Sequence, residues 1–193
     1  MSGQEILQLL RESGALLTGH FELSSGLHSP QYLQCAVALQ HAALAERLGT
    51  ALAARCRSTL ATAATVVVSP ALGGIIIGHE VGRALGVRAC FTERSGGTMS
   101  LRRGFDLEAG ETVLLVEDVI TTGRSTRETR QVVIAAGGEP AAVACIANRS
   151  GSRLLDELPL TALVNLDIPH FAPSSCPQCA AGEPLSKPGS RPG

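Results

Sequence analysis

The stretch Val113–Thr126, VLLVEDVITTGRST, decides the fold. Its apolar first half predicts a buried strand that ends at two carboxylates, Glu117 and Asp118. A turn of hydroxyl residues and glycine follows, and then a helix begins. In open α/β sheets, ligands bind where strands end. The backbone N–H groups, hydroxyls and helix N-terminus of this turn predict an anion site, and Gly123 lets the backbone approach the anion closely.

The two carboxylates restrict the kind of ligand that this site can take. A phosphate alone would be repelled by Glu117 and Asp118. A sugar phosphate fits, because its hydroxyls can donate to the carboxylates while the turn holds its phosphate. Any single residue here could equally belong to a solvated strand end with a capping Thr or Ser. The whole string favours the ligand site, because the acids, the turn and the helix start agree.

Short apolar runs alternate with helical patterns on both sides of this stretch, which predicts a parallel α/β sheet flanked by helices. Strands are expected at 65–69, 87–92, 112–116 and 140–147, and helices at 3–17, 41–57, 74–85 and from the turn to about 136. The rest is expected to be irregular, with loop and short strand at 18–35 and a mobile Gly/Ser/Arg-rich loop at 93–105. We predict one domain, with a core at about 41–150, a hood lobe from 1–40 and 150–185, and a flexible tail at 186–193.

The composition excludes several classes of function. A net charge of -1 and 3% aromatic residues argue against nucleic-acid binding. No segment is long and apolar enough to span a membrane or to act as a signal peptide, so the six cysteines are interpreted as reduced thiols of a cytoplasmic protein. The only lysine is Lys187, which excludes a Walker-type loop and Schiff-base chemistry in the body of the chain.

The string 113–126 resembles the phosphoribosyl diphosphate (PRPP) signature of the type I phosphoribosyltransferases. The resemblance implies their fold, with Glu117 and Asp118 facing the ribose and the turn holding the 5-phosphate. The PRPP-binding residues that it implies are Glu117, Asp118, Val119, Ile120, Thr121, Thr122, Gly123, Arg124, Ser125, Leu72, Gly73 and Arg94.

Four further segments resemble orotate phosphoribosyltransferases: a base-binding segment, a pyrophosphate loop with its helix, a catalytic loop and a strand end. The base-binding segment is 20–34, the pyrophosphate loop with its helix is 69–86, the catalytic loop is 93–105 and the strand end is 147–151. The resemblance implies transfer of ribose 5-phosphate from PRPP to orotate, giving orotidine 5′-phosphate and pyrophosphate in de novo pyrimidine (UMP) biosynthesis. It places Arg149 against the orotate carboxylate, with Thr121, Tyr32 and Ser24 also at the base.

The chain departs from this family's pattern where lysines are usual. Ser24 stands in place of one lysine, Leu72 and Gly73 in place of a Tyr-Lys pair, and the catalytic loop has none. The loop offers arginines instead, which can hold pyrophosphate oxygens bidentately but are poor proton donors. The expected catalytic residues are therefore Asp118, Glu117, Arg94, Arg102 and Arg103.

The resemblance also implies a cofactor and an assembly. Mg²⁺ is expected, held through PRPP and water with no direct protein ligand. A homodimer is expected, in which loop 93–104 reaches the partner's site. Two alternatives stay open: a phosphoribosyltransferase for a purine or uracil, which would leave Arg149 without a carboxylate, and a non-catalytic PRPP-sensing regulator, whose expected basic face is absent.

The histidines and the cysteine pair give only a weak metal signal. His20, His28, His41, His79 and His170 show no metal-ligand spacing and are interpreted as structural or surface residues. Cys176-Pro-Gln-Cys179 is half of a zinc knuckle, and one such pair without a second is weak.

Overall fold

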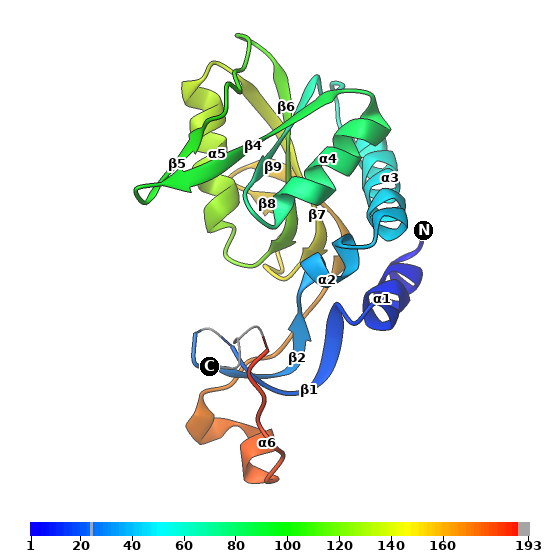
Figure 1. Cartoon of the computed structure of the whole chain (residues 1–193), viewed down its shortest axis with the longest axis vertical. Coiled ribbons are helices and arrows are strands. Elements are labelled where there is room, and N and C mark those ends of the chain that lie inside the picture. The colour runs from blue at the N-terminus through cyan, green and yellow to red at the C-terminus, as the bar shows by residue number, and fades with distance from the viewer. Residues whose placement is uncertain (24, 189–193) are drawn as a thin grey trace.

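The computed structural model describes residues 1–23 and 25–188 (Figure 1). The helices are α1 (Gly3–Glu12), α2 (Cys35–Leu39), α3 (Ala42–Thr59), α4 (Gly74–Leu85), α5 (Arg124–Ala135) and α6 (Pro177–Ala180), with a 3-10 turn at Pro173–Ser175. The strands are β1 (Leu16–Glu22), β2 (His28–Leu33), β3 (Val66–Pro70), β4 (Arg88–Ser95), β5 (Thr98–Leu101), β6 (Thr112–Ile120), β7 (Glu139–Asn148), β8 (Leu154–Leu155) and β9 (Leu158–Asn165).

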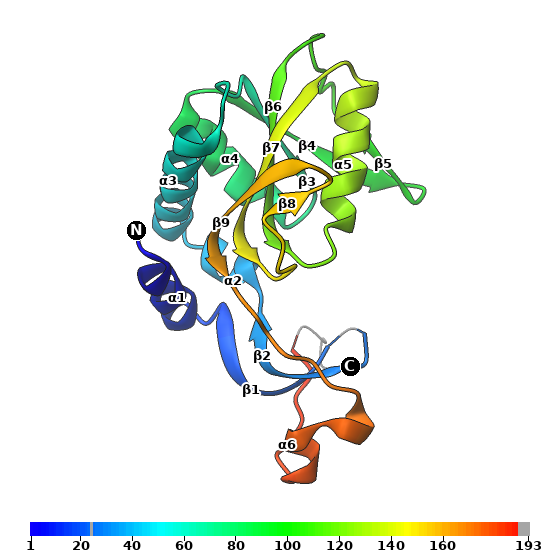
Figure 2. The ribbon, with the colours of Figure 1, turned by 180° about the vertical axis from the view of Figure 1, so that it is seen from behind.

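A seven-stranded sheet forms the core, in the order β5-β4-β3-β6-β7-β9-β8. Its five inner strands are parallel, and the edge strands β5 and β8 are antiparallel to their neighbours. The predicted α/β sheet is therefore confirmed. Helices α3 and α4 cover one face and α5 covers the other (Figures 1 and 2).

The side chains of β6 show why this strand is apolar on both faces. Leu114 and Val116 pack with the α3 and α4 side, whereas Val113 and Leu115 pack with the α5 side. Successive side chains point to opposite faces of a sheet, so a strand covered on both faces must be apolar at every position. The parallel register of β3 and β6 brings their carboxyl ends to the same edge, where the predicted anion turn lies.

The N-terminal segment differs from the prediction. The first helix ends at Glu12 rather than at 17, because Gly14 adopts a positive φ of 74° and the chain then turns into β1. Strands β1 and β2 form an antiparallel hairpin in place of the expected loop and short strand. This hairpin and the segment after β9 make the hood (Figure 1).

The predicted limit of the core at residue 150 is wrong, because β8 and β9 belong to the core sheet. β9 pairs in parallel with β7, through partners such as Val143 and Leu160. Its sequence LPLTALVN contains one proline and one threonine and follows only a short crossover, so it gives no clear strand–helix alternation.

The predicted mobile loop at 93–105 is largely a β-hairpin. Arg94 of β4 pairs with Met99 of β5, and Ser95 pairs with Thr98 across the turn. Gly96 and Gly97 both have positive φ, at 59° and 85°. A two-residue hairpin turn of type I′ needs positive φ at both positions, and glycine supplies it without steric cost. The glycines therefore close a tight turn.

The tail prediction is wrong for the residues that the structure describes. The Ser186 N–H donates to the His20 carbonyl at 2.9 Å, and the Ser186 carbonyl accepts from the Glu22 N–H at 2.8 Å. Residues 189–193 of the predicted tail lie outside the described residues. Within the described part of the chain, no helix has the length and apolar character needed to cross a membrane.

Candidate active site

Two adjacent carboxylates, the buried Glu117 and the half-buried Asp118, stand near the end of β6. Glu117 is 5% exposed, and its Oε2 accepts from the Ser125 hydroxyl at 2.8 Å. The Val119 N–H donates to Asp118 Oδ1 at 2.7 Å. Burial, and then the charge of Asp118, raises the pKa of Glu117 to about 8. Burial also raises the pKa of Asp118 above its ordinary value. The pair is therefore suited to a ligand that brings positive charge or donates hydrogen bonds.

The turn after β3 packs directly on these carboxylates. A Cβ at Gly73 would lie 2.7 Å from Asp118 Oδ1, and one at Gly74 would lie 3.0 Å from the Val116 carbonyl oxygen. Only glycine fits so close an approach. The predicted pyrophosphate turn and the predicted ribose carboxylates are thus adjacent. The Leu72 side chain is 85% exposed.

The turn after β6 is held in place by its own sequence. Gly123 has a φ of 72°, and a Cβ there would lie 2.5 Å from Leu155 Cδ1. Arg127 donates to the Thr122 carbonyl and to Asp156, the latter at 2.7 Å. The side chains of Thr121 and Thr122 remain exposed at the mouth of a pocket.

Not every predicted PRPP residue points its side chain at this mouth. Ile120 is 1% exposed in the core, and Val119 is partly buried against the other core cluster. The Arg124 side chain is 78% exposed and pairs with Glu128 at 3.0 Å. The Ser125 hydroxyl donates its hydrogen bond to Glu117.

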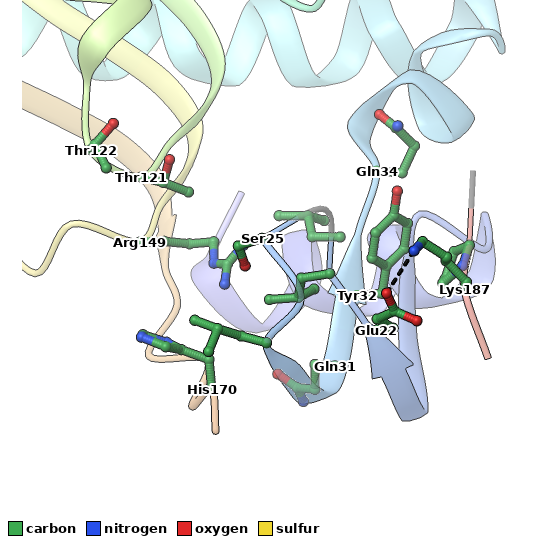
Figure 3. A pocket seen from close by; sticks show the side chains of 14 residues that line it. Glu22, Ser25, Gln31, Tyr32, Gln34, Thr121, Thr122, Arg149, His170 and Lys187 are labelled. Atoms are coloured by element: carbon green, nitrogen blue, oxygen red, sulfur yellow. Dashed lines mark hydrogen bonds and ion pairs between the residues drawn. The ribbon is translucent and has the colours of Figure 1, made fainter. Parts of the chain in front are cut away.

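The pocket has a volume of about 720 Å³ and lies between the β6 turn and the hood. Figure 3 shows Arg149, Thr121 and Thr122 on one side and Tyr32 on the other. The hood and tail supply the remaining polar lining residues, which are Glu22, Ser25, Gln31, Gln34, His170 and Lys187. Ser24, predicted at the base, lies outside the described residues.

Arg149 is placed to receive an anion in this pocket. Its backbone N–H donates to the Ile120 carbonyl at 2.7 Å, which fixes it beside the β6 turn. Its side chain is half-buried, and burial lowers its pKa. Its buried Nε has no hydrogen-bond partner, and no carboxylate lies within ion-pair distance, among residues 1–23 and 25–188. A buried cationic group without a partner needs an anionic ligand to offset its desolvation.

Comparison with known proteins agrees with this geometry. Residues 37–172 match the model of the phosphoribosyl transferase domain. The chain is 49% identical to orotate phosphoribosyltransferase of Heliobacterium modesticaldum over 99% of this chain and 100% of the relative. It is 51% identical to the enzyme of that name from Novosphingobium aromaticivorans, over 99% of this chain and 98% of the relative.

The chain belongs to the orotate phosphoribosyltransferase family. Solved structures show the same fold at lower identity. The Mycobacterium tuberculosis orotate phosphoribosyltransferase bound to Fe(III) dicitrate has a TM-score of 0.70 at 22% identity, over 85% of this chain and 96% of that one. The same protein in complex with PRPP has a TM-score of 0.67 at 23% identity, with the same coverage.

Sequence reasoning missed much of the pocket wall in this member of the orotate phosphoribosyltransferase family. Lys187 was assigned to a flexible tail, yet its Nζ lies 2.6 Å from Glu22 Oε1 beside the pocket (Figure 3). Gln31 and Gln34 lie within segment 20–34, which was already interpreted as base-binding. That segment was the only available signal for them. Nothing in the sequence shows that Lys187 returns to β1.

The three arginines predicted to be catalytic do not line the pocket of their own chain. Arg94 pairs with Glu128 on α5. Arg103 pairs with Glu93 at 2.9 Å, and Arg102 lies 3.7 Å from the same carboxylate. The β4–β5 hairpin, which carries Arg94 and is directly followed by Arg102 and Arg103, extends sideways from the core, whereas the hood lies below the core (Figure 1).

The structure divides the five histidines into two buried and three exposed residues. His20 and His28 are 4% and 5% exposed, and both contact the sulfur of Cys179. The sequence shows no ligand spacing for them because the partners lie at the other end of the chain. His41, His79 and His170 are exposed, as expected for surface residues.

Proposed function

We propose that this chain transfers the ribose 5-phosphate of PRPP to orotate, giving orotidine 5′-phosphate and pyrophosphate in pyrimidine (UMP) biosynthesis. The observation that carries the proposal is the unpaired, half-buried guanidinium of Arg149 beside the Thr121–Thr122 turn. The orotate carboxylate would satisfy this group bidentately. Uracil and the purines lack a carboxylate at any position.

The proposed roles of the site residues follow from their positions at the ends of β3 and β6. The turn from Thr121 to Ser125 holds the 5-phosphate, while Glu117 and Asp118 accept from the ribose hydroxyls. The backbone at Gly73 and Gly74 faces the pyrophosphate. A ring nitrogen of orotate then attacks the anomeric carbon as its bond to pyrophosphate breaks. Positive charge develops on the ribose, and the nearby carboxylates stabilise it.

Mg²⁺ fits this site as a cofactor held mainly through the substrate and water. Two adjacent carboxylates whose pKa is raised by burial form an oxygen-rich place where a cation is favoured. When bound, it would neutralise charge on the departing pyrophosphate. The residues of this chain that would face it are Glu117 and Asp118, through the ribose oxygens.

The catalytic arginines are proposed to act across a homodimer. Arg94 lies on the β4–β5 hairpin and Arg102 and Arg103 directly follow it, all outside the pocket of their own chain. In a dimer this hairpin can supply its positive charge to the partner's site. We place the enzyme in the cytoplasm, where six free thiols stay reduced.

A product assay tests the proposal. PRPP and Mg²⁺ are supplied with orotate, uracil, adenine or hypoxanthine, and the nucleotide formed is separated and identified. Formation of orotidine 5′-phosphate with orotate alone is expected. Reaction with uracil or a purine but not with orotate would refute the orotate assignment. No reaction with any base would favour the PRPP-sensing regulator.

A further inference from the structure

Four side chains with metal-binding atoms converge in the hood, outside the pocket lining. They are His20 on β1, His28 on β2, Cys176 immediately before α6, and Cys179 within it. All four ligand atoms lie within 4.8 Å of one another. The histidines and cysteines come from opposite ends of the chain, and Figures 1 and 2 both show α6 beside the β1–β2 hairpin.

Four of the six distances between these atoms lie within about 0.3 Å of the edges of a tetrahedral zinc site. His20 Nε2 lies 3.5 Å from Cys176 Sγ and 3.6 Å from Cys179 Sγ. His28 Nδ1 lies 3.2 Å from Cys179 Sγ and 3.0 Å from His20 Nε2. Zinc bonds of about 2.0–2.1 Å to nitrogen and about 2.3 Å to sulfur give edges of roughly 3.3–3.8 Å.

Hydrogen bonds alone do not account for the cluster. His20 Nδ1 lies 3.0 Å from the Glu183 carbonyl oxygen, which only accepts, so Nδ1 carries the ring proton. In the neutral ring, Nε2 then has one lone pair, yet it faces three neighbours, His28, Cys176 and Cys179. A single cation at the centre would bind all four atoms at once. A ligating imidazole that donates its other N–H to a carbonyl is the usual arrangement around zinc.

Leu16 at the start of β1 is buried in the main core, but the rest of the hood has only a small apolar core of its own. In 17–33 and 167–188, apart from residue 24, the buried apolar side chains are those of Phe21, Ile168 and Cys176. None of them belongs to the two large core clusters. A lobe with so small a core depends on another kind of crosslink. The four ligands join β1, β2 and α6, which together make up this lobe.

We propose that His20, His28, Cys176 and Cys179 bind one structural zinc ion that fastens the C-terminal segment to the β1–β2 hairpin. Two thiolates and two imidazoles in tetrahedral array select zinc among the common metals. The protein supplies all four ligands, so no position is left for a substrate, and the site is structural. It is separate from Glu117 and Asp118 and does not depend on the proposed reaction.

Metal analysis of the full-length, untagged protein tests the proposal. Protein produced with zinc in the medium and dialysed is expected to carry about one zinc ion per chain. Cys176→Ser and Cys179→Ser are each expected to lose it. Cys90→Ser is the matched control, because Cys90 is buried in β4 of the core and should not affect zinc content. Equal zinc in all variants would overturn the proposal.

Measurements on the wild-type chain keep the proposal testable if the serine variants fail to fold. Removing the metal with a chelator is expected to lower the unfolding temperature, and adding zinc back should restore it. Replacement by Co²⁺ should give the visible absorption of a tetrahedral thiolate complex. Dialysed wild-type protein without zinc, iron as its only metal, or a Cys176–Cys179 disulfide in freshly purified protein would each refute it.

Discussion

Replacing Glu117 by glutamine should change how many protons leave the enzyme when Mg²⁺ and PRPP bind. The pKa of Glu117 is raised to about 8, chiefly by burial. At pH 7 its carboxyl is therefore about 90% protonated in the free enzyme. Ribose hydroxyls and a nearby cation favour the ionised form, so binding should release up to about 0.9 proton per site at pH 7. At pH 9.5 the release should fall below about 0.1 proton, because the group is already ionised.

Isothermal titration calorimetry measures this release directly. The apparent binding enthalpy is compared in two buffers with different ionisation enthalpies, and the slope gives the protons released. The Glu117→Gln variant should release only the protons that come from PRPP. The difference from wild type therefore gives the number of protons released by Glu117. Glu46→Gln is the control, because the Glu46 side chain is 60% exposed on α3. Equal proton release by wild type and Glu117→Gln at pH 7 would refute the reasoning.

The same pKa shift predicts a trend in stability. A carboxyl whose pKa is raised in the folded state stabilises the fold below its ordinary pKa of 4.5. That contribution is lost as the pH rises through about 8. Without ligand, Glu117→Gln should therefore gain stability relative to wild type between pH 5 and pH 8. Thermal unfolding of both proteins at pH 5 and pH 8 checks this prediction. The same difference in unfolding temperature between variant and wild type at both pH values would contradict it.

Three further predictions concern the base, the arginines and the tail. Arg149→Gln should raise the KM for orotate roughly 10- to 150-fold, because the variant loses a charge-assisted hydrogen bond to the orotate carboxylate. Arg153→Gln on the surface should leave the KM unchanged. Equal KM values for the two variants in steady-state assays would refute the role of Arg149. Arg102→Ala chains should lose roughly 10- to 150-fold in turnover and Asp118→Asn chains should also turn over slowly, but mixtures of the two should regain activity when co-refolded. No recovery in proven heterodimers would show that this segment does not serve the partner. Truncation after Leu185 should lower the unfolding temperature and raise the orotate KM, because the chain loses its hydrogen bonds to β1 and part of the pocket wall; an unchanged protein would restore the sequence-based view of a flexible tail.

Some errors of sequence reasoning have a clear physical cause. Segment 93–105 is rich in glycine and arginine, which is typical of loops, but Gly96-Gly97 also satisfies a tight hairpin turn. Composition does not distinguish these two uses of glycine. Strand β9 is not evident from the sequence, because only its pairing with β7 makes it a strand.

The sequence by itself determined the parallel α/β core and predicted the chemistry of the turn after β6. The signal in Val113–Thr126 is local, because the strand, the carboxylates, the turn and the helix start are contiguous in the chain. Arg149 is predicted at the base only through the resemblance to the family, because a residue that follows a strand could equally lie on the surface. Only the tertiary structure brought His20 within reach of Cys176, 156 residues away, and returned Lys187 to the pocket. Such contacts depend on how two chain ends meet in space, and no spacing pattern along the sequence records that.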